Sequence, residues 1–117
     1  MSLRVEASKV EPDIVVLHLS GSLTIGPQTD ALEPHVRKLL GRGDKKIIFE
    51  LSGVERIDSL GGVTLVRCFF AARDAGGVLH LACPSPNVQR LFKGIQAENV
   101  IPLYSTVAAA CENFTAG

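Results

Sequence analysis

Hydrophobic and polar residues along this chain form alternating blocks, some with the spacing of strands and others with that of helices. Two blocks, residues 46–51 and 78–83, are nearly continuous apolar runs, which is typical of strands buried on both faces of a sheet. Between them, residues 60–75 carry apolar side chains at helical spacing and are closed by Gly76 and Gly77. We therefore expect two central strands joined by a helix.

The N-terminal residues predict a hairpin of two antiparallel strands. Residues 3–8 alternate between apolar and polar, and residues 14–19 are rich in β-branched side chains. The turn-forming residues 11–13 separate the two runs. We expect the second strand to end at residues 20–22 and a loop to follow at residues 23–27.

A helix is expected from residue 28 or 29 to residue 40, because Leu32, Val36, Leu39 and Leu40 recur on one helical face. Pro34 lies inside this range. Since few hydrogen bonds are lost when a proline falls in the first turn, we expect a bend there and not a full break.

Three further elements follow the second central strand. Ser85 and Pro86 are a capping residue and a favoured first residue for a helix that ends at Gly94. Residues 100–104 predict a short strand, and its proline places it at an edge of the sheet. Ser105 or Thr106 is expected to cap a last helix over residues 107–114.

The resulting order, β-β-α-β-α-β-α-β-α, predicts an α/β fold with a mixed sheet of four to five strands and about four helices. Strands joined by helices should be parallel, and the first hairpin antiparallel. A length of 117 residues is that of one domain, which we expect to span residues 1–117.

Composition narrows the classes of function. The 12 basic and 12 acidic residues give no net charge, which argues against a direct nucleic-acid partner. No apolar run approaches the ~18 residues of a membrane span, so membrane insertion is not expected. Three cysteines without CxxC spacing indicate buried, reduced thiols and hence a cytoplasmic location.

Motifs for catalysis or cofactor binding are absent from the sequence. It contains no P-loop, GxGxxG, HExxH, GxSxG or zinc-site spacing, so we expect no cofactor, no metal and no catalytic residue. His18 and His80 fall in expected strands, where structural roles are commoner. A Ser59–His–Asp arrangement stays open, since its members need only meet in space, but no oxyanion-loop motif accompanies it.

The start of helix 60–75 has an unusual composition. Asp58 or Ser59 can cap the helix by accepting a hydrogen bond from its first turn. Gly61 and Gly62 follow, and each costs about 1 kcal/mol relative to alanine in a helix. We interpret the two glycines as allowing the close approach of another backbone or of a ligand.

Four stretches, in order, resemble STAS domains, the anti-sigma factor antagonists and their relatives. Residues 19–23 are similar to the family's L-x-G-x-L strand end, and residues 58–61 to its Asp-Ser-x-Gly helix start. Residues 75–79 resemble its x-G-G-x-L strand entry, and residues 84–92 its S-P-x-V-x-R-L-F helix start. The resemblance covers nearly the whole chain and implies a single STAS-like domain.

In the resembled antagonists, the serine of this motif is phosphorylated by a partner kinase, and Ser59 is the matching residue. The resemblance therefore implies a bacterial transcription regulator that binds an anti-sigma factor or related ATP-using serine kinase and is switched off by phosphorylation of Ser59. A phosphate at a helix N-terminus meets free N–H groups, whereas a docked partner would face a desolvated dianion.

The sequence departs from the family's pattern at three positions near this motif. Leu60 stands where many antagonists have a second serine or threonine, and Ser22 and Thr24 stand where many have acidic residues. Other roles therefore remain open: a non-phosphorylated adaptor on the ATPase of a lipid-transport ABC system, or a stress-complex or small-ligand module. The partner's identity and the choice between monomer and dimer also remain open.

A helical projection of residues 60–75 divides them into three faces. Thr64, Arg67, Ala71 and Asp74 form the expected solvent face, and Gly62, Leu65, Phe69 and Ala72 the expected sheet face. Val63, Val66 and Phe70 lie between, either at the rim of the core or as a docking strip in line with Ser59. The expected partner-binding residues are Asp58, Ser59, Leu60, Gly61, Gly62, Val63, Val66, Arg67, Phe70, Ser22 and Thr24.

Overall fold

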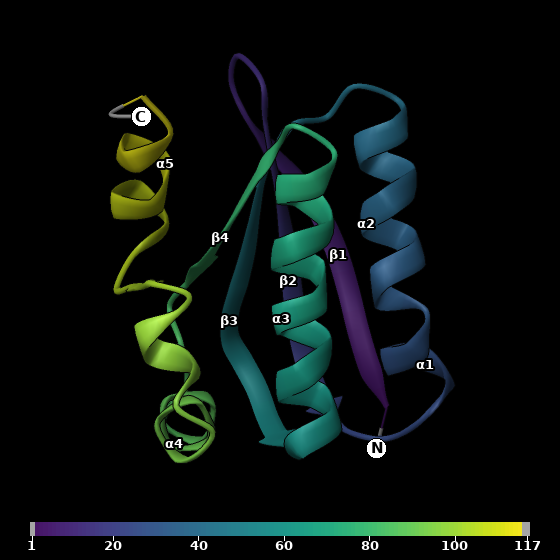
Figure 1. Ribbon diagram of the computed structural model, residues 1–117, viewed down its shortest axis with the longest axis vertical. Helices are drawn as coiled ribbons and strands as arrows, with labels where there is room; N and C mark the ends of the chain where they lie inside the picture. Colours follow the sequence, from purple (N-terminus) through teal and green to yellow (C-terminus); the bar gives the residue numbers. More distant parts are fainter. Residues whose placement is uncertain (1, 116–117) are drawn as a thin grey trace.

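The computed structural model describes residues 2–115 and contains one five-stranded sheet (Figure 1). The strands lie in sequence order: β1 (Leu3–Val10), β2 (Ile14–Leu23), β3 (Lys46–Ile57), β4 (Val78–Ala82) and β5 (Leu103–Tyr104). β1 and β2 pair antiparallel, and the remaining neighbours pair parallel. The predicted α/β class, mixed sheet and internal positions of the two apolar strands are confirmed.

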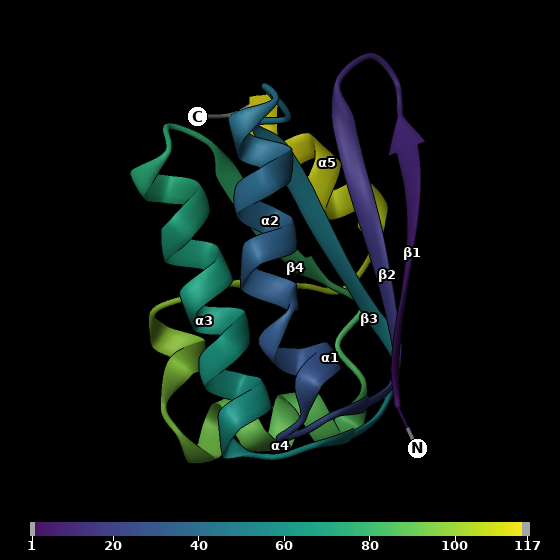
Figure 2. The same ribbon diagram turned by 90° about the vertical axis from the view of Figure 1, so that its right-hand side faces the viewer.

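Helices cover both faces of the sheet. They are α1 (Pro27–Asp30), α2 (Leu32–Gly41), α3 (Ser59–Asp74), α4 (Pro86–Gly94), the short 3₁₀ helix η1 (Ala97–Asn99) and α5 (Val107–Thr115). Figures 1 and 2 show α2 and α3 side by side over one face, with α5 on the opposite face. No helix within residues 2–115 has the length and apolar character needed to cross a membrane.

Two apolar clusters of unequal size hold these layers together. The larger one fills the space under α2 and α3, where Leu17, Phe49 and Leu65 are fully buried. The smaller one lies under α5 and includes Val16, Ile48 and Ala110. Because alternate residues of a strand point to opposite faces, both clusters draw on β2 and β3, which explains the continuous apolar runs.

β2 and β3 both extend further than expected. Residues 20–22, where the second strand was expected to end, and residues 52–57, beyond the expected strand 46–51, continue the strands and pair with each other, as in Gly21 opposite Val54. The register shifts twice, once between His18 and Ser20 and once between Gly21, whose φ is 91°, and Ser22. Residues that resemble turn signals therefore form bulges, which bend strands without ending them.

The expected first helix is divided at Ala31 into α1 and α2, so the prediction of a bend without a break was wrong. Pro34 is the third residue of α2. Its ring excludes the carbonyl of Asp30 from helical bonding and it has no N–H to donate, so the chain reorients before it. The first turn of α2 then tolerates the proline, as expected.

The C-terminal elements follow the expected order with shorter limits for one strand. Ser85 caps α4, and Thr106 caps α5 by accepting a hydrogen bond from the Ala109 N–H at 3.0 Å. The strand expected at residues 100–104 is reduced to Leu103–Tyr104, because the N–H groups of Val100 and Ile101 bond to the carbonyl of Ala97 instead. β5 is an edge strand, as predicted.

Candidate functional site

The site begins where β3 ends and α3 starts, at the carboxyl end of the parallel strands (Figure 1). Asp58 is the N-cap of α3: its Oδ1 accepts a hydrogen bond from the Gly61 N–H at 2.8 Å. Its Oδ2 accepts another from the Ile25 N–H at 2.9 Å. One carboxylate therefore completes the first turn of α3 and anchors the loop between β2 and α1.

Hydrogen bonding keeps the Asp58 carboxylate ionised. Burial by itself would raise the pKa of Asp58, but the N–H groups of Gly61 and Ile25 more than offset this and lower the pKa below its ordinary 3.8. At neutral pH the residue before Ser59 thus carries a full negative charge beside the positive end of the helix dipole.

Ser59 is exposed and is the first residue of α3. Sequence reasoning left open whether it or Asp58 caps the helix, and the structure assigns the cap to Asp58. In residues 2–115, no hydrogen bond joins Ser59 to any of the three histidines, so the Ser59–His–Asp arrangement does not form. Ser59 is thus exposed to solvent and does not cap the helix.

The two glycines of the first turn have different packing roles. A Cβ on Gly61 would lie 1.9 Å from the carbonyl oxygen of Leu23, so this helix can approach the end of β2 only with glycine there. A Cβ on Gly62 would instead lie 2.8 Å from the end of the Leu91 side chain in α4. Both glycines are buried, and the expected close approach of another backbone is confirmed for Gly61.

The expected faces of α3 need one correction. Arg67 and Asp74 are exposed as predicted, but Thr64 and Ala71 are buried because α2 packs against this side of the helix. Gly62, Leu65 and Ala72 are buried as predicted, and Phe69 is half-buried. A helix covered by both a sheet and a second helix buries more than one face, which a simple amphipathic projection does not describe.

The three residues between those faces remain reachable from solvent. Val63 is 39% exposed, and Val66 and Phe70 are half-buried. Val66, Phe70 and Arg67 line a groove of about 390 Å³ between α2 and α3, opposite Arg37 of α2. Arg37 is held by an ion pair with Glu33 at 3.0 Å, so the groove has an apolar floor and charged rims.

Three other residues near the site behave differently from expectation or were missed. Ser22 is only 6% exposed and lies inside β2, so its side chain does not reach the surface. Thr24 is half-buried, and its carbonyl accepts a hydrogen bond from the Thr29 hydroxyl. Ile25, which sequence reasoning passed over, is 78% exposed and tied to Asp58. A large β-branched apolar residue in an expected loop, next to Gly26 and Pro27, was the available signal.

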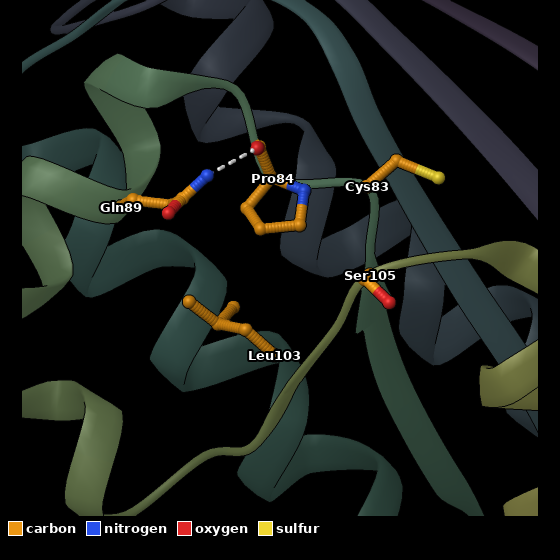
Figure 3. Close-up of a pocket in the computed structure, with 5 residues that line it drawn as sticks. All are labelled: Cys83, Pro84, Gln89, Leu103 and Ser105. Atoms are coloured by element: carbon orange, nitrogen blue, oxygen red, sulfur yellow. Dashed lines mark hydrogen bonds between the residues drawn. The ribbon is translucent and has the colours of Figure 1, made fainter.

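A separate hollow of about 250 Å³ lies at the carboxyl ends of β4 and β5 (Figure 3). The Gln89 side-chain amide donates to the Pro84 carbonyl at 3.0 Å, and the Cys83 sulfur points away from Gln89 and Leu103. Burial raises the pKa of the Cys83 thiol, so it is protonated at neutral pH. In the part of the chain that the structure describes, no group of three metal-ligating side chains occurs.

Comparison with known proteins places this arrangement in a family. The family model of the STAS domain matches residues 7–110. A Thermotoga maritima protein, provisionally named an anti-sigma factor antagonist, is 27% identical over 104 residues, which are 89% of this chain and 92% of that protein.

Solved structures share the fold. An anti-sigma factor antagonist from Mycobacterium paratuberculosis superposes with a TM-score of 0.78 at 21% identity, covering 96% of this chain and 93% of that one. The phosphorylated form of the Bacillus cell fate determinant SpoIIAA superposes with a TM-score of 0.70 at 18% identity, covering 95% and 99%. With the family model matching most of its length, this chain belongs to the STAS domain family, and it is similar to proteins named as anti-sigma factor antagonists.

Proposed function

We propose that this chain is a phosphorylation-controlled antagonist that binds an ATP-using anti-sigma factor kinase while Ser59 is unmodified. The observation that carries the proposal is the exposed Ser59 hydroxyl on the first residue of a helix that Asp58 already caps. A kinase can reach such a hydroxyl without breaking a structural hydrogen bond. Modification therefore changes the surface and leaves the fold intact.

Electrostatics explain how a phosphate would act at this position. A phosphoserine adds about −1.5 to −2 charges and three acceptor oxygens. The positive end of the helix dipole at the start of α3 favours that charge. The ionised carboxylate of Asp58, next to the phosphate, would repel it. The same carboxylate accepts a hydrogen bond from the Ile25 N–H. The phosphate would thus be tolerated by the domain while altering the charge beside the loop that carries Ile25.

The surface around Ser59 suits a protein partner. Ile25, which is bonded to Asp58, and Val63, in the first turns of α3, are exposed apolar side chains, and Val66 and Phe70 line the groove between α2 and α3. Burying such side chains favours association, and a dianion trapped in the same contact would lack a solvation shell. One phosphate on Ser59 would therefore shift the protein from the bound to the free state.

The phosphorylated SpoIIAA structure supports the proposal, because that protein carries a phosphate on the same fold. Its identity of 18% shows the shared fold alone. The departures at Leu60, Ser22 and Thr24 bear on which kinase would bind, and Ser22 is too buried to contact one directly.

Affinity capture from the native cytoplasm, with phosphosite mapping, tests the proposal. The unmodified chain and Ser59→Ala should both capture a kinase of the anti-sigma factor type, and phosphate should appear on Ser59 alone. Ser59→Asp should fold but capture less. Ser105→Ala, at another exposed serine, is the matched control and should behave like wild type.

Two outcomes would contradict the proposal. Phosphate on Ser85 or Ser105, with Ser59 unmodified, would move the switch elsewhere. Capture of a transporter ATPase by a chain that is never phosphorylated would instead identify a non-phosphorylated adaptor.

A further inference from the structure

Three neighbouring strands bring Ser8, His18 and Glu50 together on the sheet face opposite α2 and α3. In the strand register, His18 of β2 lies between Glu6 of β1 and Glu50 of β3, and Ser8 lies two residues along from Glu6 on the same face. α5 packs on β3, β4 and β5 on this side, and Figure 2 shows β1 and β2 extending beyond it.

The three side chains form a continuous hydrogen-bonded chain. The Nε2 atom of His18 is 2.9 Å from the Ser8 hydroxyl, and its Nδ1 atom is 3.2 Å from Oε1 of Glu50. These are the contacts by which a histidine links a hydroxyl nucleophile to an orienting carboxylate.

Glu50 is a rigidly held carboxylate. Its side chain is only 14% exposed, and Oε2 accepts a hydrogen bond from the Ser52 N–H at 2.9 Å. Burial by itself would raise the pKa of Glu50, but the bonds from Ser52 and His18 outweigh it and lower the pKa. The group is therefore ionised at neutral pH.

The ionised carboxylate determines where the imidazole proton lies. A carboxylate only accepts hydrogen bonds, so Nδ1 of His18 must carry the proton and donate it to Glu50. In the neutral ring, Nε2 then holds a lone pair and accepts the Ser8 hydroxyl proton. Ser8 thus faces a general base in the correct tautomer.

We propose that Ser8, His18 and Glu50 form an acyl-accepting site, in which Ser8 takes an acyl group from activated esters such as thioesters and phenyl esters. This site is separate from the Ser59 switch and does not depend on it.

The reaction balances with these groups alone. The Ser8 Oγ attacks the carbonyl carbon while its proton moves to Nε2 of His18. The bond from carbon to the thiolate or phenolate breaks, and that group leaves with the electron pair and takes up the proton. An ester on Ser8 remains, and Glu50 stabilises the transient imidazolium.

The openness of the site defines the donor class. The His18 side chain is 44% exposed, so the protein does not enclose the acyl group. Loss of one oxyanion-binding donor slows acyl transfer by about 10²–10³-fold in proteases, and these three side chains supply none. Donors with good leaving groups are therefore the ones that Ser8 can use.

Treatment of the whole chain with p-nitrophenyl acetate, followed by peptide mapping, tests the site. We expect one hydroxylamine-labile acetyl ester per chain, on Ser8. His18→Gln should slow its formation by about 10²-fold, the usual contribution of a general base. Glu50→Gln, which keeps the size but loses the charge, should also slow it. Ser20→Ala is the matched control, because Ser20 lies two residues further along β2, opposite Arg4, and its rate should equal that of wild type.

Mapping the acetylated residues of the wild-type chain tests the proposal even if a variant fails to fold. Acetyl groups found only as amides on lysines would overturn the proposal, as would an ester on Ser20 or Ser59 in place of Ser8. An unchanged rate in folded His18→Gln would overturn it as well. A thioester on Cys83 would have the same effect; burial raises the pKa of that thiol, so none is expected.

Discussion

Asp58, the N-cap of α3, links the start of this helix to the loop between β2 and α1. Its two carboxylate oxygens bond to the N–H groups of Gly61 and Ile25, so the helix start and the preceding loop share one anchor. The adjacent Ser59 therefore does not serve as the cap of the helix. Under the proposed function, Asp58 supports the helix while Ser59 is left available for phosphorylation.

Asp58→Ala should lower the free energy of unfolding by about 1–2 kcal/mol at pH 7, since it removes an N-cap and a loop bond. The pKa of Asp58 is lowered in the folded state, so its contribution is fully present above the unfolded value near 4 and is lost as pH falls through the folded pKa. Urea unfolding of both proteins should show the difference shrinking below about pH 4. A difference that grows in acid would contradict this role.

Gly61→Ala and Gly62→Ala form a matched pair, because each gains about 1 kcal/mol of helix propensity. At Gly61 the new methyl group would overlap the Leu23 carbonyl, and backbone must move, so we expect a net loss of at least about 1–3 kcal/mol. At Gly62 it meets only the flexible side chains of Leu91 and Ile95, and stability should change little. Thermal unfolding compares the two. Equal changes in stability in the two variants would show that the Leu23 carbonyl does not restrict which residue can replace Gly61.

At the scale of elements, α3 serves both the core and the surface. Leu65, Cys68 and Ala72 are fully buried against the sheet, and Thr64 and Ala71 are buried as well in a helix that also packs against α2. Burial raises the pKa of the Cys68 thiol to about 12, so this cysteine is inert packing. The remaining strip of Val63, Val66 and Phe70 is left partly open along the groove. α3 thereby holds the Ser59 end in a fixed position beside an apolar strip.

Phe70→Ala tests whether that strip binds a partner. We expect partner affinity to fall by about 1–3 kcal/mol, as for an aromatic interface residue. Because Phe70 is half-buried and packs edge-on against Phe69, stability should fall by less than the ~3–5 kcal/mol typical of a buried phenylalanine. Calorimetric binding and thermal unfolding measure the two quantities. A full core-sized stability loss with unchanged binding would assign Phe70 to the core.

For the whole molecule, the sheet order gives the two apolar strands different environments from the outer ones. β3 lies between β2 and β4, and its residues 47–49 are fully buried. β1 and β5 are the edges, and β1 carries mostly exposed side chains. Packing is therefore densest at the centre and decreases outward.

Hydrogen exchange should follow this gradient. The slowest amides are expected in residues 47–49 of β3 and 79–81 of β4, because opening them requires both helical layers to separate from the sheet. Residues of β1 and β5 should exchange faster. Mass-spectrometric exchange at the peptide level resolves these segments, and rapid exchange throughout 47–49 would contradict the arrangement.

The sequence alone determined the features that local pattern encodes: the alternation of strands and helices, the strands buried on both faces, the cap at Ser85, a cap at Ser105 or Thr106, and the position of Ser59 at a helix start. Apolar spacing reports how an element is buried, and capping chemistry acts within four residues, so neither needs knowledge of distant contacts.

Only the tertiary structure decided the features that depend on register between distant segments. The bulges that extend β2 and β3, the contact of Gly61 with Leu23, and the bond from Ile25 to Asp58 each join residues more than 25 positions apart. The alignment of Ser8, His18 and Glu50 also required three strands to pair in one register. A shift of one residue would turn His18 to the opposite face, and no local pattern carries that information.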